Sequence, residues 1–296
     1  MSQHPGAAPN PGVAILLTVG SVSERAPMAN STMANGTATA GRARIAARTL
    51  RTDNWRKAPV LTVVGLVGWL AYATVRVFMQ KYYWVGDHHY LTPFYSPCVS
   101  NSCTQDAAEF GTFLPKGWFL PYAALTLPFL LLFRFTCYYY RRAYYRAFWV
   151  SPPACAVPDG HVSYTGETRF PLIGQNIHRY FFYAAVLISL INTWDAIRAF
   201  HSPQGFGFGL GNLVLVANVV LLWLYTISCH SCRHVIGGRL KHFSKHPLRY
   251  RAWTLVSRLN SRHMLLAWVT LGSLAVTDFY VMAVSAGWFS DLRFIH

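Results

Sequence analysis

Four side chains with metal-binding chemistry follow directly after an apolar run that ends at Ile227. They are Cys229, His230, Cys232 and His234. Thiolates and neutral imidazoles are the donors that bind zinc, iron and iron–sulfur clusters in proteins. Because these four residues lie at the end of a predicted membrane helix, a redox centre at the edge of a bilayer is favoured over a structural zinc site.

In one continuous helix, the two cysteines would share one face and the two histidines another. An unbroken helix therefore cannot surround one small metal centre with all four groups. Either the helix unwinds near Gly237 and Gly238, or ligands from another segment complete the shell. Cys155 is the predicted thiol from such a segment, and His161 is a reserve imidazole. The alternative is that these groups are interfacial side chains that bind no metal.

Two thiolates and two imidazoles form the ligand shell of a Rieske-type 2Fe–2S cluster, in which histidines replace cysteines on one iron and raise the reduction potential. Such a potential suits the delivery of electrons to a quinone. Haem b is the alternative cofactor, but a haem inside a helix bundle needs histidines that project into its core. The interiors of the predicted spans contain no histidine. His178, His230, His234 and His263 lie at the predicted cytoplasmic ends of spans, and His89 and His201 lie on the other side. A haem at the midplane is therefore disfavoured, and one near the inner edge stays open.

Membrane helices must position this cluster. Of the 296 residues, 53% are hydrophobic and 12% are charged, whereas soluble domains have roughly 25% charged residues. A helix needs about 20 apolar residues to cross a bilayer. The windows that meet this requirement cover about 60–78, 118–136, 179–199, 210–229 and 263–285. The sequence therefore predicts an all-α, polytopic membrane protein with a five-helix domain over residues 51–296 and a disordered, basic tail over 1–50.

The formal net charge of +16 is distributed unevenly between the connecting segments. Arg and Lys gather before the first span, between the second and third, and between the fourth and fifth. By the positive-inside rule these segments face the cytoplasm, so the N-terminus is cytoplasmic and the C-terminus external. They are predicted to contact lipid headgroups and a soluble partner, without any nucleic acid. The fourth connection is interpreted as a docking face rather than a folded domain.

Ionisable side chains also occur within the predicted spans, where charges are costly and tend to pair or to line polar cavities. They are Arg76, Asp195, Arg198 and Asp278. In a structural interpretation, Arg76, Asp195 and Asp278 form an ion-pair network that ties the helices together. In a functional interpretation, the same three residues and Tyr280 bind a quinone headgroup and relay protons. A rival pocket lies at the inner ends of the spans, near His178, Arg179 and His263.

The first predicted external loop contains two cysteines, Cys98 and Cys103, separated by Val-Ser-Asn-Ser. Disulfides persist on the oxidising side of a membrane. A small disulfide loop is therefore predicted here, and two unpaired thiols are the alternative.

Several segments together carry a family resemblance. They are Tyr95-Ser-Pro-Cys98, Tyr164-Thr-Gly-Glu-Thr-Arg-Phe-Pro171, Gln175-Asn-Ile-His-Arg-Tyr-Phe-Phe182, the Cys229–His234 cluster and Thr277-Asp-Phe-Tyr280. From roughly Thr52 to the C-terminus, the chain resembles the membrane-anchor subunit of succinate dehydrogenase, respiratory complex II. The resemblance is to the type with a single five-helix anchor and a Rieske-type cluster in place of haem.

This resemblance implies that a flavoprotein and an iron–sulfur subunit dock on the cytoplasmic face of the cell inner (plasma) membrane. Electrons from succinate would pass through them to the anchor and reduce a quinone, expected to be menaquinone. Under this hypothesis, Cys155 with Cys229 or Cys232, together with His230 and His234, supplies the cluster ligands. The alternatives are a di-haem b anchor of the same complex and a purely structural anchor without a redox centre.

Overall fold

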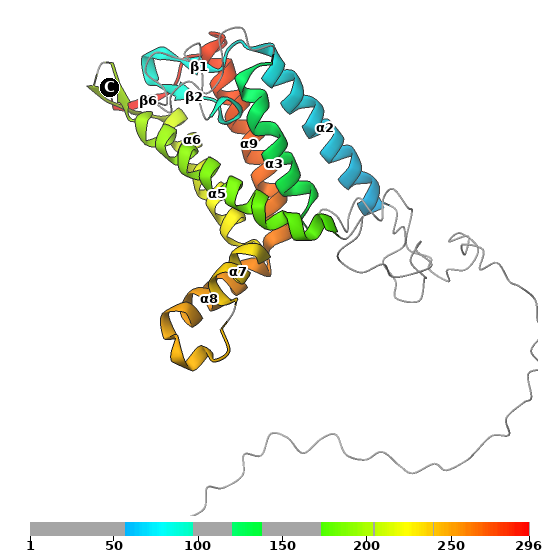
Figure 1. The fold of residues 1–296 in the computed structure, drawn as a ribbon. Coiled ribbons are helices and arrows are strands. Elements are labelled where there is room, and N and C mark those ends of the chain that lie inside the picture. Colours follow the sequence, from blue (N-terminus) through cyan, green and yellow to red (C-terminus); the bar gives the residue numbers. More distant parts are fainter. Residues whose placement is uncertain (1–56, 97–119, 138–172, 204, 239, 296) are drawn as a thin grey trace, which may run out of the picture. The chain divides into compact units, whose positions relative to one another are not determined.

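The computed structural model describes residues 57–96, 120–137, 173–203, 205–238 and 240–295 (Figure 1). All of them belong to one unit of the chain, Arg42–His296. Among them, four helices are long and apolar enough to cross a membrane: α2 (Lys57–Met79), α5 (Ile173–Arg198), α6 (Leu210–Ile227) and α9 (His263–Ser285). Each overlaps one of the predicted spans, and together they confirm a helical, multi-pass membrane protein.

The other predicted span, 118–136, corresponds to a shorter apolar helix over Tyr122–Phe135. It begins as the 3-10 helix η3 (Tyr122–Leu125) and continues as α3 (Thr126–Phe135). The 4 residues of η3 and the 10 of α3 rise by about 23 Å together, which is less than the roughly 30 Å of a hydrocarbon core. Within the described residues this segment is therefore shorter than expected, and the five-span topology stays a prediction.

The long helices pack side by side (Figure 1). α6 packs against α5 and α9, α3 packs against α5, and α2 packs against α9. A buried cluster that includes Phe133, Tyr225 and Leu271 joins α3, α6 and α9. The Trp69 indole of α2 attaches this helix to α9, because its Nε1 donates a hydrogen bond to the Leu271 carbonyl at 3.1 Å.

Short antiparallel ribbons lie where α6 begins, at what we call the ribbon end. The pairs are β1 (Trp84–Val85) with β2 (Tyr90–Leu91), β3 (His201–Ser202) with β4 (Gly205–Phe206), and β5 (Phe208–Gly209) with β6 (Arg293–Ile295). The Asp291 carboxylate accepts hydrogen bonds from the Tyr90 hydroxyl at 2.8 Å and from the Gly211 N–H at 2.9 Å. Burial, followed by this carboxylate, raises the pKa of Tyr90. The C-terminal segment is thereby fixed to the first turn of α6.

Two short helices form a hairpin where α6 ends, at what we call the hairpin end (Figure 1). α7 (His230–Gly237) is followed by the 3-10 turn η4 (Phe243–Lys245), and α8 (Pro247–Asn260) leads back to α9. The Arg249 guanidinium donates hydrogen bonds to the carbonyls of Ile236 and Gly238 at 2.8 and 3.2 Å. The Arg233 guanidinium lies 4.8 Å from the Trp253 ring centroid. The fourth connection therefore forms a packed helical hairpin, and its interpretation as a docking face stays a prediction.

Candidate metal centre

The helix that precedes the Cys/His cluster is interrupted at the first cysteine. α6 ends at Ile227, Ser228 keeps a helical conformation, and Cys229 is extended with φ −64° and ψ 143° before α7 begins at His230. The helix is therefore interrupted at Cys229, ahead of the predicted position at Gly237 and Gly238. Cys229 is fully buried, and its Sγ accepts a hydrogen bond from a backbone N–H of α7.

His178, near the start of α5, contacts this buried thiol. Its Nε2 lies 3.0 Å from the Sγ of Cys229. The ligand atoms of His178, Cys229 and His230 all lie within 4.8 Å of one another. The Phe133 ring stacks on one side of His178 with a centroid distance of 4.9 Å, and the His230 ring lies 5.4 Å away in a stacked orientation. Three donors from two segments thus converge on one point.

A second imidazole–thiol pair belongs to the same buried cluster. His263, the first residue of α9, places its Nε2 3.4 Å from the Sγ of Cys137, which follows α3. Cys137 and Cys229 pack in one hydrophobic cluster. The Tyr225 ring stacks on His263 at 5.0 Å and contacts Phe133 at 5.4 Å. Because Phe133 also stacks on His178, one set of aromatic rings holds both imidazoles.

Two hydroxyl groups set the tautomers of these imidazoles. Thr136 donates its hydroxyl proton to the Leu132 carbonyl at 2.6 Å, so its Oγ1 accepts from His178 Nδ1 at 2.7 Å. Ser228 donates to the Tyr225 carbonyl at 2.8 Å and accepts from His263 Nδ1 at 2.7 Å in the same way. With the proton on Nδ1, each Nε2 presents a lone pair to a thiol. This is the form of histidine that binds a metal, with its other nitrogen held by a neighbouring group.

The charge state of the centre follows from its burial. Desolvation, and then the nearby Cys137, raises the pKa of the Cys229 thiol to about 12. Burial lowers the pKa of His230, and His234 and Arg179 lower it further. The Cys229 thiol is therefore protonated at neutral pH and donates its S–H to the lone pair of His178. A bound cation would displace that proton, because a metal binds the thiolate. The donor set of two thiols and two imidazoles fits an iron–sulfur cluster of the Rieske type.

The other predicted ligands lie in different surroundings. Cys232 is buried, and burial raises its pKa, but its sulfur is not among the converging ligand atoms. His234 is exposed, and its ring lies 6.0 Å from that of His230 in an edge-on orientation. Cys155 and His161, and the predicted disulfide between Cys98 and Cys103, lie outside the described residues.

The residues predicted for a quinone pocket divide among separate contacts toward the ribbon end. The Arg76 Nε donates to the Asp278 carboxylate at 2.6 Å, and the Tyr72 hydroxyl donates to it at 2.6 Å. Asp195 instead accepts a hydrogen bond from the Ser96 hydroxyl, and Tyr280 donates to Asp291 at 2.5 Å. The predicted ion-pair network is thus reduced, among the described residues, to the pair Arg76–Asp278.

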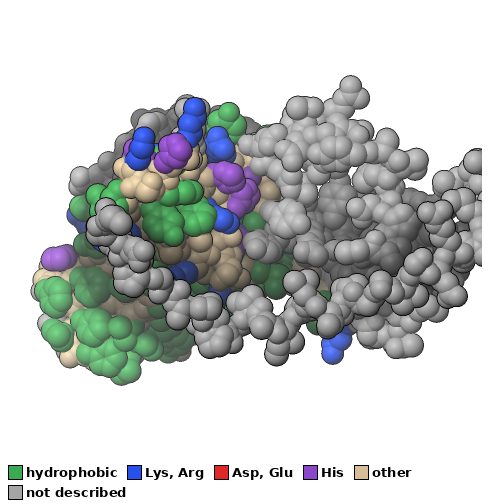
Figure 2. All heavy atoms as spheres, turned by 90° about the horizontal axis from the view of Figure 1, so that it is seen from below, with side chains coloured by type: hydrophobic (Ala, Val, Ile, Leu, Met, Phe, Trp, Pro, Cys, Tyr) green, Lys and Arg blue, Asp and Glu red, His purple; other side chains and the backbone are tan. Residues whose placement is uncertain are grey.

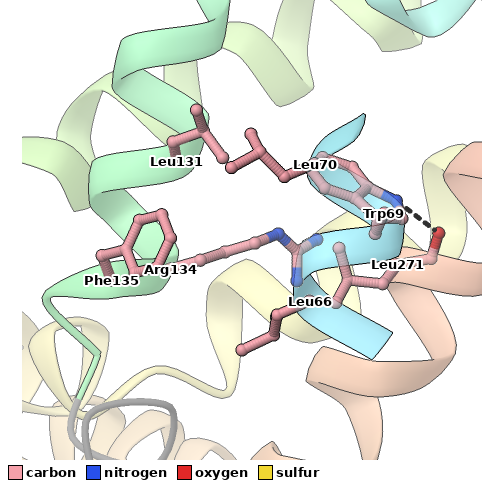
Figure 3. Close-up of a pocket in the computed structure, with 7 residues that line it drawn as sticks. All are labelled: Leu66, Trp69, Leu70, Leu131, Arg134, Phe135 and Leu271. Carbon is pink, nitrogen blue, oxygen red and sulfur yellow. Dashed lines mark hydrogen bonds between the residues drawn. The ribbon is translucent and has the colours of Figure 1, made fainter. Parts of the chain in front are cut away.

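A small pocket lies between α2, α3 and α9, on the side of the bundle where Arg134 and Phe135 end α3. Figure 3 shows the Arg134 side chain extending from α3 across this pocket toward Trp69 and Leu271, while Leu66 and Leu131 form apolar walls. Arg134 is 6% exposed. Its Nη1 donates to the Ala267 carbonyl at 3.1 Å. Its guanidinium lies 4.7 Å from the centroid of the Tyr225 ring, which stacks on His263.

Comparison with known proteins identifies the chain. The family model of the actinobacterial succinate dehydrogenase subunit SdhC matches residues 57–287. The chain belongs to this family. One chain of a solved structure described as the Mycobacterium smegmatis Sdh1 complex in the apo form is 66% identical, with a TM-score of 0.78 over 88% of this chain and 99% of that one. A search of curated proteins found no match. As an SdhC, the chain is a membrane-anchor subunit of an oxidoreductase complex.

Three members of the two imidazole–thiol pairs in this SdhC were not predicted as ligands. His178 and His263 were assigned to a rival quinone pocket, and Cys137 was not singled out. The sequence could have indicated them, because all three lie at ends of apolar segments on the same predicted side of the membrane. Cys137 ends the second apolar segment, His178 begins the third span, and His263 begins the last, all at the same side as Cys229.

Proposed function

We propose that this chain anchors succinate dehydrogenase in the membrane and passes electrons from succinate oxidation to a membrane quinone through a Rieske-type 2Fe–2S cluster. The observation that carries the proposal is the pairing of two imidazoles with two thiols in one buried cluster, where a hydroxyl contacts the Nδ1 atom of each imidazole. Such a donor set, on a chain of this family, has the composition of a Rieske ligand shell.

The residues proposed to hold the cluster are Cys137, Cys229, His178 and His263. When bound, the cluster accepts and releases one electron at a potential that its histidine ligands raise. Thr136 and Ser228 orient the two rings and keep each Nε2 free of a proton. The surrounding aromatic rings exclude water. His230, whose ligand atom lies in the same group as those of His178 and Cys229, is the alternative imidazole.

The charge distribution supports an orientation with the hairpin end in the cytoplasm and the ribbon end outside. In the cell inner (plasma) membrane, a flavoprotein and an iron–sulfur subunit would then dock at the hairpin end, next to the proposed cluster. Electrons would enter the membrane domain at this level, so the quinone is expected here as well.

The Arg134 pocket is therefore our preferred quinone site. Its apolar walls suit a quinone ring with an isoprenoid tail, and the guanidinium can donate a hydrogen bond to a quinone carbonyl oxygen. By contrast, Arg76 and Asp278 satisfy one another, which favours a structural role for them. Menaquinone is the quinone that the family resemblance implies.

The test uses the purified complex that contains this chain. Iron and acid-labile sulfide are measured on assembled complexes after gel filtration, and reduced samples are examined by EPR. We expect a Rieske-like signal that is lost in His178→Ala and in His263→Ala. The control is His234→Ala, which alters an exposed histidine that is not a proposed ligand and should leave the signal intact. A signal that survives both buried substitutions would contradict the ligand assignment. Visible b-type bands would support a haem anchor, and the absence of both signals would support a purely structural one.

A further inference from the structure

The α8 helix has three distinct sides. At 100° per residue, one side carries Trp253 and Val256, which pack toward α7 in the hairpin. A second side carries an apolar stripe in which Leu248 is 77% exposed and Leu255 is 58% exposed. Between these two leucines lies Ala252 on the same side. The stripe is therefore a part of the helix that the hairpin does not cover.

The third side of α8 is basic and adjoins the apolar stripe. Arg251 and Arg258 are both exposed and follow Leu248 and Leu255 by three residues each. No Asp or Glu occurs in the sequence between Asp195 and Asp278. Figure 2 views the molecule from the hairpin end, where Lys, Arg and His side chains lie around hydrophobic ones and no acidic side chain is visible on the described surface. A leucine stripe edged by arginine is typical of a helix that lies in a membrane interface.

The position of α8 relative to the spans is fixed by its C-terminal end. α8 ends at Asn260 and α9 begins at His263, and the two residues between them can reach roughly 10 Å at most. The Asn260 side chain also donates to the Ser228 carbonyl at 2.7 Å, at the end of α6. The last turn of α8 is therefore held at the level where two membrane helices end.

We propose that the Leu248–Leu255 stripe of α8 lies in the cytoplasmic leaflet and that Arg251 and Arg258 bind the phosphate groups of anionic phospholipids there. The leucines would reach below the headgroups, while the long arginine side chains extend up to the phosphates. The proposal rests on the orientation stated above and does not depend on the cluster. It assigns this one side of the hairpin to lipid, so that docking subunits use its other exposed surfaces.

Lipid is favoured over a protein partner because the leucines and the arginines lie on adjacent but separate sides of α8. Anionic leaflets attract basic side chains at their surface and accept apolar ones just below it. The alternation of Leu and Arg by three and four residues, at the level where α6 ends and α9 begins, matches that layered arrangement. A soluble partner would have to bury the same stripe beside the membrane surface.

The test introduces the photo-crosslinking residue p-benzoylphenylalanine in the complete complex, reconstituted in nanodiscs with equal parts of phosphatidylcholine and phosphatidylglycerol. Leu255→p-benzoylphenylalanine is expected to form phospholipid adducts, with phosphatidylglycerol in several-fold excess. The control is the same substitution at Tyr250, which lies on the opposite side of α8 and is 48% exposed. It is expected to give few lipid adducts.

Charge variants in the Leu255-substituted background then test whether the arginines attract the anionic lipid or the stripe only touches lipid of any charge. Arg251→Gln with Arg258→Gln is expected to equalise the two phospholipid adducts. Lys241→Gln with Lys245→Gln, which removes the same charge from the turn of the hairpin, is expected to leave the excess unchanged. An adduct with another polypeptide, the absence of lipid adducts from position 255, or an excess that survives loss of both arginines would overturn the proposal.

Discussion

Thr136 Oγ1 lies 2.7 Å from His178 Nδ1 while it donates its own proton to the Leu132 carbonyl. Ser228 makes the same arrangement with His263 and the Tyr225 carbonyl. Each hydroxyl belongs to the residue directly after a helix, and each has a single proton, already given to a carbonyl of the preceding turn. Both rings are therefore oriented, and both Nε2 lone pairs are exposed to thiols, by hydrogen bonds within the chain itself.

Removing the Thr136 hydroxyl should weaken metal binding without disturbing the packing. Thr136→Val is nearly isosteric, but it leaves His178 Nδ1 without its acceptor and frees the ring to change tautomer. Loss of such a supporting hydrogen bond reduces metal affinity by about 10–100-fold. We expect a lower iron content per complex and an altered EPR line shape. Thr136→Ser, which keeps the hydroxyl, should behave like the parent, and equal iron contents in the Val and Ser variants would contradict the role of the hydroxyl.

The Arg76–Asp278 pair should be a stabilising contact of the bundle. Its side chains are 3% and 0% exposed, and removing one partner of a buried pair costs about 3–5 kcal/mol because the other charge is left unpaired. Asp278→Leu or Arg76→Met alone should therefore lower the midpoint of thermal unfolding of the detergent-solubilised complex.

The double variant Arg76→Met with Asp278→Leu provides the control for this pair. Replacing both charges by apolar groups is often neutral for stability. The double variant should therefore unfold closer to the parent than either single variant does. A double variant as unstable as the sum of the two single ones would contradict the pairing argument.

The sequence predicted the long membrane helices closely because their signal is local. A stretch of about 20 apolar residues must become a helix in a bilayer, and the predicted 263–285 matches α9 (His263–Ser285). The Arg76–Asp278 contact was also predictable, since buried charges of opposite sign on two spans must find partners. The hydrogen bond between Asp195 and Ser96 was not predictable in this way, because Ser96 is an uncharged loop residue.

The sequence placed Cys229 and His230 in the candidate site, but not their partners from other helices. No Gly or Pro lies beside Cys229 to indicate from the sequence that the helix is interrupted there. His178 and Cys229 are 51 positions apart in sequence, and His263 and Cys137 are 126 apart. Such pairs form through packing of whole helices, which a motif of neighbouring residues cannot reveal. The local cluster therefore drew attention to His234, which the structure leaves exposed.

Gly211 should be intolerant of any side chain. A Cβ at this position would overlap the ring of Tyr90, which is fully buried and bonded to Asp291. Gly211→Ala is expected to destabilise the ribbon end by about 1–3 kcal/mol, the usual cost of overpacking. Gly272→Ala in α9 is the matched control, because a Cβ there meets no atom within 4 Å. Thermal unfolding of the complex measures both, and equal midpoints for the two variants would show that the Tyr90 contact is not limiting.

Arg134 should control the affinity for quinone. Loss of a hydrogen bond to a charged group costs about 1.5–3 kcal/mol, so Arg134→Met is expected to raise the KM for a soluble quinone roughly tenfold or more. Succinate oxidation with a dye that takes electrons from the soluble subunits should not change. Arg134→Lys keeps the charge and should give a smaller rise in KM. Tyr280→Phe tests the pocket at the ribbon end, and a rise in KM there with none in Arg134→Met would place the quinone at that end.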